Sequence, residues 1–393
     1  MPLRCEVLVV GAGPAGGELA RQLAFHGRAV LLVDQLRDLN QAAFSSAALP
    51  RETVEQFGLP AEVVASRWRA WQLIGPGEER HHWTAPAPLG VVLDFAALRL
   101  WLAEQCRRWG GRVELGLRAV ACRPLPEGME TVLQRPGGGE LVVHSRWVVD
   151  ATGQGRALLG EPTDPADLVS GRGVEWLLRL DAERWAAWSE RLTFLLGSGW
   201  VAQGYGWVFP MAAPCLKVGV CRLDDPRGEA PPLGRDLVTL LERLGLEGAE
   251  VLDRHGGLIR SSIHRREAHG RGRLLALGDA VSTANLLGGE GIRHALASSR
   301  VLAPLLLREP DPDRLRRRYE RELRRRLGWR WALSGRLARR TWLGLRDPAA
   351  DRRLARLLRG LRGRPAADLS ALLFHYRFER YGLRALPYLL ERA

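Results

Sequence analysis

The segment 5–35 restricts the fold of this chain more than any other part of the sequence. A strand-like apolar run at 6–10 is followed by a helix-like run at 18–25 and a second strand-like apolar run at 29–33. A turn with the spacing G-x-G-x-x-G joins the first strand to the helix and comprises Gly11, Gly13, Pro14, Ala15 and Gly16. Asp34 follows the second strand. This order predicts a βαβ unit within a parallel sheet.

Each part of this unit has a role in binding a dinucleotide. The first glycine permits a tight turn, the second lets the backbone approach a pyrophosphate, and the third lets the helix pack closely on the strand. The positive N-terminal end of the helix faces the phosphates. An acid at position 34 can bind a ribose hydroxyl, and an acid rather than an arginine there argues against a 2′-phosphate.

A second segment, far along the chain, complements this unit. A strand-like run over 274–277 ends at Gly278 and Asp279. A glycine-rich turn then opens a helix-like run and comprises Gly288, Gly289, Glu290, Gly291 and Ile292. If FAD extends from the first unit, we expect Asp279 to hold its ribityl and pyrophosphate middle. The turn lets backbone approach the flavin ring, and the helix N-terminus behind it stabilises negative charge on the reduced ring.

A third segment, WVVDATGQGR (147–156), predicts a later strand of the same sheet that ends beside the cofactor. In this order, the three segments resemble the FAD-binding fold of the p-hydroxybenzoate hydroxylase superfamily. The stretch GYGWVFP (204–210) is similar to the Tyr-x-Trp-x-Phe-Pro signature of the geranylgeranyl reductase family. The stretches GDA (278–280) and GGEGI (288–292) match the flavin motif of that family.

The resemblance implies an α/β fold: a Rossmann-type FAD-binding domain with a mixed-sheet substrate domain and a helical C-terminal region. We expect the FAD-binding domain to be discontinuous, with the substrate sheet and the helices following it. The FAD-binding domain is expected to comprise 1–75, 100–160 and 265–310. The sheet of the substrate domain is expected at 161–264, with parts of 76–99, and the helical C-terminal region at 311–393. The segments 36–75 and 80–100 are expected to be rich in loops and helices and to cross over the flavin.

The resemblance further implies an FAD-dependent oxidoreductase that reduces C=C bonds of a polyprenyl or geranylgeranyl substrate with hydride from N5 of reduced flavin. Since no second G-x-G-x-x-G unit is evident, NADPH or reduced ferredoxin is the expected electron donor. Two alternatives remain open. One is an FAD-dependent monooxygenase or halogenase, and the other is a non-redox carotenoid (lycopene-type) cyclase in which reduced flavin only stabilises charge.

The stretch 204–210 also has a direct physical interpretation. Tyr205, Trp207 and Phe209 alternate along a strand and therefore share one face. This aromatic row could wall a flat cofactor or an apolar ligand, or it could be the core face of a sheet. The catalytic candidates are Tyr205, Trp207 and Glu290, of which Tyr205 and Glu290 are the candidates for acid–base work. Glu290 could equally be a solvent-facing carboxylate at a helix start.

Positive charge is concentrated near the C-terminus. The chain of 393 residues has a formal net charge of +14, and the segment 314–345 alternates arginine clusters with Leu and Trp at helical spacing. This pattern favours an amphipathic helix on an anionic membrane, or a helix packed on the protein with a solvated arginine face. Basic surface would also suit an acidic ferredoxin. Nothing supplies the stacking platform or reading helix of a nucleic-acid-binding protein.

The remaining composition excludes several classes. The sequence has no uninterrupted apolar run of the length that spans a bilayer. Its five cysteines form neither a C-x-x-C pair nor a Cys/His cluster with metal-ligand spacing, so we expect reduced thiols and no bound metal. A cytoplasmic protein, peripheral on a membrane, is the expected localisation.

Overall fold

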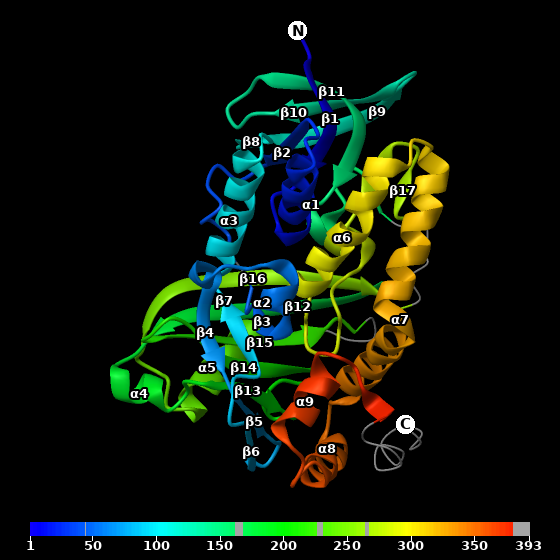
Figure 1. Cartoon of the computed structure of the whole chain (residues 1–393). Helices are drawn as coiled ribbons and strands as arrows, with labels where there is room; N and C mark the ends of the chain where they lie inside the picture. Colours follow the sequence, from blue (N-terminus) through cyan, green and yellow to red (C-terminus); the bar gives the residue numbers. More distant parts are fainter. Residues whose placement is uncertain (44, 162–167, 226–230, 264–266, 380–393) are drawn as a thin grey trace.

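The computed structural model describes residues 1–43, 45–161, 168–225, 231–263 and 267–379. Figure 1 shows two lobes, each built on its own β-sheet, with the C-terminal helices along one side of both. The upper lobe in this view contains the first strand, and the lower lobe contains the strands of the middle of the chain. Among the described residues, no helix is both long and apolar enough to span a bilayer.

The sheet of the upper lobe has the strand order β17-β18-β11-β1-β2-β8, with a hairpin of β9 and β10 attached to β11. Strands β18, β11, β1, β2 and β8 run parallel to one another, whereas β17 is antiparallel to β18. Their bounds are β1 Leu3–Val10, β2 Val30–Asp34, β8 Arg112–Leu115, β9 Arg118–Leu125, β10 Gly128–Gln134, β11 Glu140–Asp150, β17 Gly270–Arg271 and β18 Leu274–Ala276. The carboxyl ends of β1, β2, β11 and β18 therefore meet at one edge, where ligands bind in open α/β sheets.

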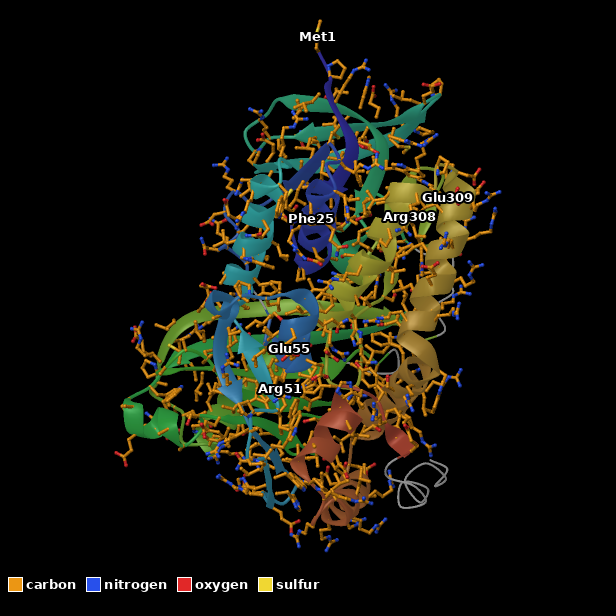
Figure 2. The ribbon with its side chains drawn as sticks, in the orientation of Figure 1. Met1, Phe25, Arg51, Glu55, Arg308 and Glu309 are labelled. Atoms are coloured by element: carbon orange, nitrogen blue, oxygen red, sulfur yellow. The ribbon has the colours of Figure 1, made fainter. Side chains whose placement is uncertain are left out.

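Three helices cover this sheet: α1 (Pro14–Phe25), α3 (Phe95–Arg108) and α6 (Ile292–Arg308). Helix α1 packs between α3 and α6, and its Leu19 and Leu23 are fully buried. Figure 2 places Arg308 and Glu309, at the end of α6, in the upper lobe, and Arg51 and Glu55 of α2 near the junction with the lower lobe. Helix α6 thus starts near the junction between the lobes and runs away from it.

The lower lobe contains a seven-stranded sheet in the order β16-β12-β15-β14-β13-β5-β6. Its strands are β5 Ala70–Ile74, β6 Arg80–Thr84, β12 Leu168–Arg179, β13 Arg191–Leu196, β14 Gly204–Pro210, β15 Cys215–Leu223 and β16 Glu250–Ser262. One face packs on α5 (Leu233–Arg243) through Val208 and Val218. The opposite face, here called the inner face, carries Tyr205, Trp207 and Phe209.

The prediction of loops and helices for 36–75 and 80–100 is wrong in part, since these segments contain the five short strands β3 to β7, some of which connect the two lobes. A three-stranded sheet has the order β3-β7-β4, and helix α2 follows its first strand. The bounds are β3 Ala48–Pro50, α2 Glu52–Phe57, β4 Val64–Trp68 and β7 Gly90–Leu93, with the short helix α4 at Ala182–Ala186 at the far end of the lower lobe.

Three helices complete the described chain: α7 (Pro312–Gly344), α8 (Pro348–Gly360) and α9 (Ala366–Leu373). The first half of α7 buries Leu315, Tyr319 and Leu323, spaced by four residues, in the core of the upper lobe. Gly328 has φ +75° and interrupts the helix, and α7 then continues beside the lower sheet. The apolar stripe predicted for 314–345 is therefore used for packing inside the protein, and its arginines face outwards.

The fold class predicted from the sequence is confirmed by this architecture. The domain boundaries stay predictions, with one detail added by the strand pairing. Strand β5 is hydrogen-bonded within the lower sheet, where it pairs with β13 and β6, although the predicted FAD-binding segment extends to residue 75.

Candidate active site

The glycine-rich turn after β1 is shaped by close backbone contacts. Gly11 has φ +108°, and a Cβ atom added there would lie 2.3 Å from the carbonyl oxygen of Ala151. A Cβ at Gly16 would lie 1.9 Å from the carbonyl oxygen of Gly11. A Cβ at Gly13, in contrast, would meet no atom within 4 Å. Gly11 and Gly16 thus let strand and helix pack, while Gly13 leaves the backbone open to a ligand.

The start of α1 can accept a phosphate group. The helix begins at Pro14 with Gly13 as its N-cap, so no side chain covers its first N–H groups. Such N–H groups, together with the positive end of the helix dipole, bind anions. The position of Pro14 and Ala15 in the first turn agrees with the role predicted for this segment.

Asp34 lies at the end of β2, next to this turn. Its Oδ2 accepts a hydrogen bond from the Ala12 N–H at 2.7 Å, and its Oδ1 accepts one from the Leu36 N–H at 2.9 Å. Because each carboxylate oxygen can accept two hydrogen bonds, Asp34 keeps acceptor capacity for a ribose hydroxyl. Its partly exposed side chain is accessible for that contact.

The structure brings the Gly278–Asp279 segment against the same turn, although the two are far apart in the sequence. Gly278 has φ +65°, and a Cβ there would lie 2.7 Å from the Cβ of Ala15. Oδ1 of Asp279 accepts a hydrogen bond from the Thr283 hydroxyl at 3.0 Å. Both carboxylate oxygens lie 3.7 Å from the position of a Cβ on Gly291. Burial raises the pKa of the Asp279 carboxyl, and the Thr283 hydrogen bond offsets part of that shift.

The glycine-rich turn at the start of α6 is held in place by Asn285. The Asn285 N–H donates to the carbonyl oxygen of Glu290 at 2.8 Å, and its side chain donates to the hydroxyl of Ser334 on α7 at 2.6 Å. A Cβ on Gly288 would meet nothing within 4 Å. No side chain caps Ile292, the first residue of α6. This turn, here called the flavin turn (Gly288–Ile292), therefore presents open backbone and an uncapped helix end.

These features fit an extended FAD. Open backbone at Gly13 suits the pyrophosphate, the acceptor capacity of Asp34 suits a ribose, and the flavin turn suits the ring. Asp279 lies between the turn after β1 and the flavin turn. Among the described residues, no group of three or more His, Cys, Asp or Glu side chains is arranged to hold a metal ion.

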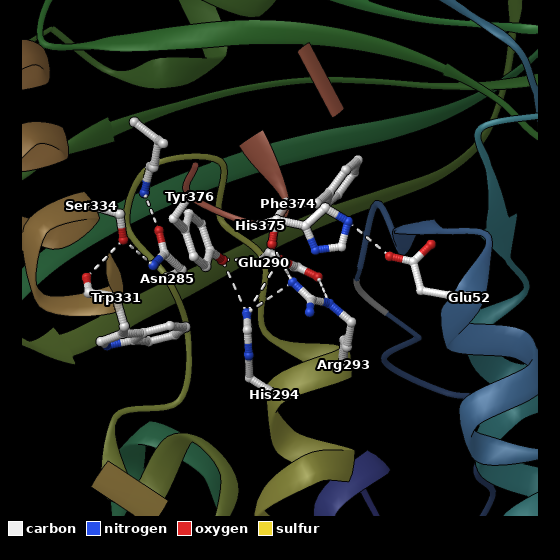
Figure 3. Close-up of polar contacts among 11 residues, drawn as sticks. Glu52, Asn285, Glu290, Arg293, His294, Trp331, Ser334, Phe374, His375 and Tyr376 are labelled. Carbon is white, nitrogen blue, oxygen red and sulfur yellow. Dashed lines mark hydrogen bonds and ion pairs between the residues drawn. The ribbon is translucent and has the colours of Figure 1, made fainter. Parts of the chain in front are cut away.

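Glu290 is buried in a network of charged and polar side chains (Figure 3). Arg293 donates to its two oxygens at 2.5 and 2.8 Å, and the Tyr376 hydroxyl donates at 3.0 Å. His294 Nε2 lies 3.2 Å away. Burial opposes ionisation, but the Arg293 guanidinium and His294 outweigh it and hold the pKa of Glu290 well below its usual range. The interpretation of Glu290 as a solvent-facing carboxylate is therefore wrong. Its predicted role in acid–base chemistry stays a prediction, and ionisation makes it unsuited to donate a proton.

The network extends to the C-terminal segment and to α2. The carbonyl oxygen of Phe374 accepts a hydrogen bond from Arg293 at 2.6 Å. His375 forms an ion pair with Glu52 of α2 at 2.8 Å (Figure 3). Tyr376 has φ +55°, a conformation in which few non-glycine residues occur. The last described turn of the chain thus closes over the flavin turn.

The aromatic row of β14 lies on the inner face and reaches the flavin turn at one end. The hydroxyl of Tyr205 is 3.1 Å from the position of a Cβ on Gly289. The Tyr205 ring packs on Trp342 of α7, with centroids 4.9 Å apart. Burial raises the pKa of Tyr205 well above its usual value, so the phenol stays protonated at neutral pH. The two interpretations of this row are compatible, since it is part of a core cluster and also borders the site.

Several residues at this site were not among the predicted site residues. Arg99 of α3 is buried and donates to the carbonyl oxygen of Gln41 at 2.6 Å and to that of Leu39, which ties the crossing segment to the upper lobe. Glu175 and Lys217 lie buried on the inner face, with Lys217 Nζ 3.7 Å from Glu175 Oε1. Lys217 is the only lysine of the chain, and that rarity was the available signal.

Comparison with known proteins agrees with this geometry. Residues 4–155 match the family described as FAD binding domain. The chain is 29% identical to a digeranylgeranylglycerophospholipid reductase of Haloferax volcanii over 315 residues, 76% of this chain and 74% of the relative. It is 29% identical to a menaquinone reductase of Mycobacterium tuberculosis over 354 residues, 85% and 83% of the two chains.

A solved structure extends the likeness to nearly the whole chain. A geranylgeranyl bacteriochlorophyll reductase-like protein of Thermoplasma acidophilum has a TM-score of 0.81 at 18% identity, covering 97% of this chain and 99% of its own. A flavin-dependent halogenase and a monooxygenase share the fold less closely. The fold and the site thus define an FAD-dependent oxidoreductase of the p-hydroxybenzoate hydroxylase type. Within that class, the chain is similar to proteins named as digeranylgeranylglycerophospholipid, menaquinone and geranylgeranyl diphosphate reductases.

Proposed function

We propose that this protein reduces isolated C=C bonds in a polyprenyl chain, and that the substrate binds between the inner face of the lower sheet and the flavin turn. The approach of Tyr205 to Gly289 is the observation that carries this proposal, because it brings an apolar aromatic wall to the flavin turn, where we propose that the ring of the cofactor binds. The names of the relatives, which include digeranylgeranylglycerophospholipid and geranylgeranyl diphosphate reductases, support a substrate of this class.

The inner face has the chemistry that a polyprenyl chain requires. It shares one buried cluster with Leu286, beside the flavin turn, and with Trp342 and Leu354 of the C-terminal helices. Such a wall binds isoprenoid units by burying apolar surface. It also excludes water, which would otherwise compete for a reactive hydride donor.

When bound, reduced FAD supplies a hydride at N5. The chain's own residues then have separate tasks. Gly13 and the first turn of α1 bind the pyrophosphate, and Asp34 and Asp279 hold the hydroxyl-bearing parts. The uncapped start of α6 favours negative charge near the ring. Tyr205 and Trp207 orient the alkene rather than donate its proton, since the pKa of Tyr205 is raised.

We propose NADPH or reduced ferredoxin as the electron donor. Peripheral membrane contact through 314–345 is proposed as well, in a form set by the packing of α7. Because Leu315, Tyr319 and Leu323 are buried, the contact would use the outward arginines and Trp329, which is 63% exposed. Such binding is electrostatic and weakens with salt.

The test is a single turnover without oxygen. The dithionite-reduced enzyme is mixed with geranylgeranyl substrates, and flavin reoxidation is followed by absorbance, with the fully saturated phytanyl analogue as the control. Reoxidation by the unsaturated substrate alone, together with a product heavier by two hydrogens, is the expected result. Oxygen or halogen in the product would favour the monooxygenase or halogenase alternative, and a cyclised product of unchanged mass would favour the cyclase.

A further inference from the structure

The inner face of the lower sheet carries a buried acid that the sequence analysis did not identify. Strand register places Trp207 of β14 opposite Gly219 of β15, and Gly219 opposite Glu175 of β12. His255 of β16 is the next neighbour of Glu175 in the same row. These side chains point to the face that carries the aromatic row, because facing partners of neighbouring strands share a face.

Glu175 is held in a defined orientation. It is 0% exposed, and its Oε2 accepts a hydrogen bond from Trp207 Nε1 at 2.9 Å. The indole reaches Glu175 by lying across β15 at Gly219, where a Cβ would be only 2.2 Å from the ring. In the described part of the chain, Oε1 has no hydrogen-bond partner, and Lys217 Nζ lies 3.7 Å from it. One oxygen is therefore anchored and the other is available.

Glu175 lies between the two segments that are expected to border the flavin. At one end of the inner face, Tyr205 and Ile259 approach Gly289 of the flavin turn. At the other end, Lys217 Nζ donates a hydrogen bond to the carbonyl oxygen of Ser45, in the segment expected to cross the flavin. Glu175 lies in the row between these two contacts.

The surrounding ionisable groups leave Glu175 as the acid best suited to give up a proton here. Burial raises its pKa, and Lys217, Trp207 and His255 only partly oppose that shift. His255 pairs with Asp253 at 2.9 Å. Burial raises the pKa of Tyr205 and brings that of Cys221 to about 12, so both are weak acids, while Glu290 is ionised.

We propose that Glu175 is the proton donor for the reduction of the alkene. The inference rests on the proposed function. As the C=C π bond breaks, one carbon receives the hydride, with its electron pair, from the reduced flavin. The other carbon receives the proton of the Glu175 carboxyl. The resulting Glu175 carboxylate is stabilised by the Lys217 ammonium and the Trp207 N–H until solvent returns the proton, and the flavin ends oxidised.

The test compares Glu175→Gln with Glu250→Gln, both as FAD-loaded enzyme. Gln keeps the acceptor for Trp207 but is no acid. Glu250 is an exposed carboxylate on the same sheet that pairs with Arg179 at 2.9 Å, and it is the matched control. General acid catalysis contributes about 10²–10⁴-fold. Glu175→Gln should therefore slow flavin reoxidation by the polyprenyl substrate by at least about 100-fold, with FAD affinity and reoxidation by oxygen unchanged. Reoxidation at the wild-type rate would overturn the proposal.

A second measurement does not depend on turnover. Infrared spectroscopy distinguishes the C=O stretch of a protonated carboxyl from that of a carboxylate. Near neutral pH, wild type and Glu250→Gln should show one protonated-carboxyl band that Glu175→Gln lacks, beside any band of Asp279, whose pKa is also raised and which all three proteins share. Lys217→Met should move the titration of the Glu175 band to higher pH. Absence of this band from wild type would also overturn the proposal. If no polyprenyl substrate reoxidises wild-type flavin while the band is present, the proposed function fails by itself.

Discussion

Substitutions of two glycines in the turn after β1, Gly16 and Gly13, should affect stability and FAD binding separately. Gly16→Ala places a Cβ 1.9 Å from the Gly11 carbonyl oxygen, whereas Gly13→Ala places one in open space. The first change forces strand and helix apart at a contact between backbone atoms. The second leaves the fold intact, and its methyl group occupies the space that a pyrophosphate would use.

The magnitudes follow from these contacts. Overpacking of about 1–3 kcal/mol in Gly16→Ala lowers Tm of the FAD-free protein by roughly 1–4 °C. Gly13→Ala changes only an N-cap residue and costs about 1 kcal/mol or less. Losing one charged hydrogen bond of about 1.5–3 kcal/mol to the pyrophosphate weakens FAD binding by about 10- to 100-fold.

The assay uses protein freed of flavin. Differential scanning fluorimetry gives Tm of each variant, and the change in flavin fluorescence on titration gives Kd for FAD. The reasoning is refuted if Gly13→Ala binds FAD as tightly as wild type, or if it melts below Gly16→Ala.

Four further outcomes are expected. Tyr376→Phe removes the hydroxyl that donates to Glu290, and should cost about 1–3 kcal/mol in urea unfolding; no change would show that the network is not formed in solution. The depressed pKa of Glu290 contributes stability above its ordinary value of 4.5, and this is lost as pH falls below it, so Glu290→Gln should flatten the acid limb of a stability-versus-pH curve. Leu323→Ala should cost about 2–5 kcal/mol without affecting vesicle binding, since Leu323 is in the core. Replacing Arg321 and Arg325 by Glu should instead weaken binding to anionic vesicles at low salt and leave Tm unchanged; a variant that binds as well as wild type would argue against the membrane contact.

Local patterns allowed much of the cofactor site to be predicted. The turn after β1 and the turn before α6 each combine glycine spacing with a strand and a helix, and those features depend on neighbours in sequence. Their convergence followed from the parallel order of β1 and β18 in a known fold. What each glycine contacts could not be predicted, because the contacts of Gly11 and Gly278 are with Ala151 and Ala15 of other segments.

The contacts of Glu175 on the inner face could not be predicted from the sequence, for a different reason. Glu175, Gly219 and Trp207 become neighbours only through the order β12-β15-β14, in which the first and last strands are separated by the one that follows both in the chain. Alternation along one strand shows which residues share a face, but not which strand lies alongside. The contact of Tyr376 with Glu290 likewise depends on how the last helices fold back.

The only lysine of this chain is buried, so the surface of the folded protein carries no lysine side chain. Lys217 is 5% exposed, so amine-directed reagents find no side chain to modify on the folded exterior. Acylation at this position would therefore report the moments when the lower sheet opens, and its suppression by a bound ligand would measure occupancy without any coloured cofactor or turnover.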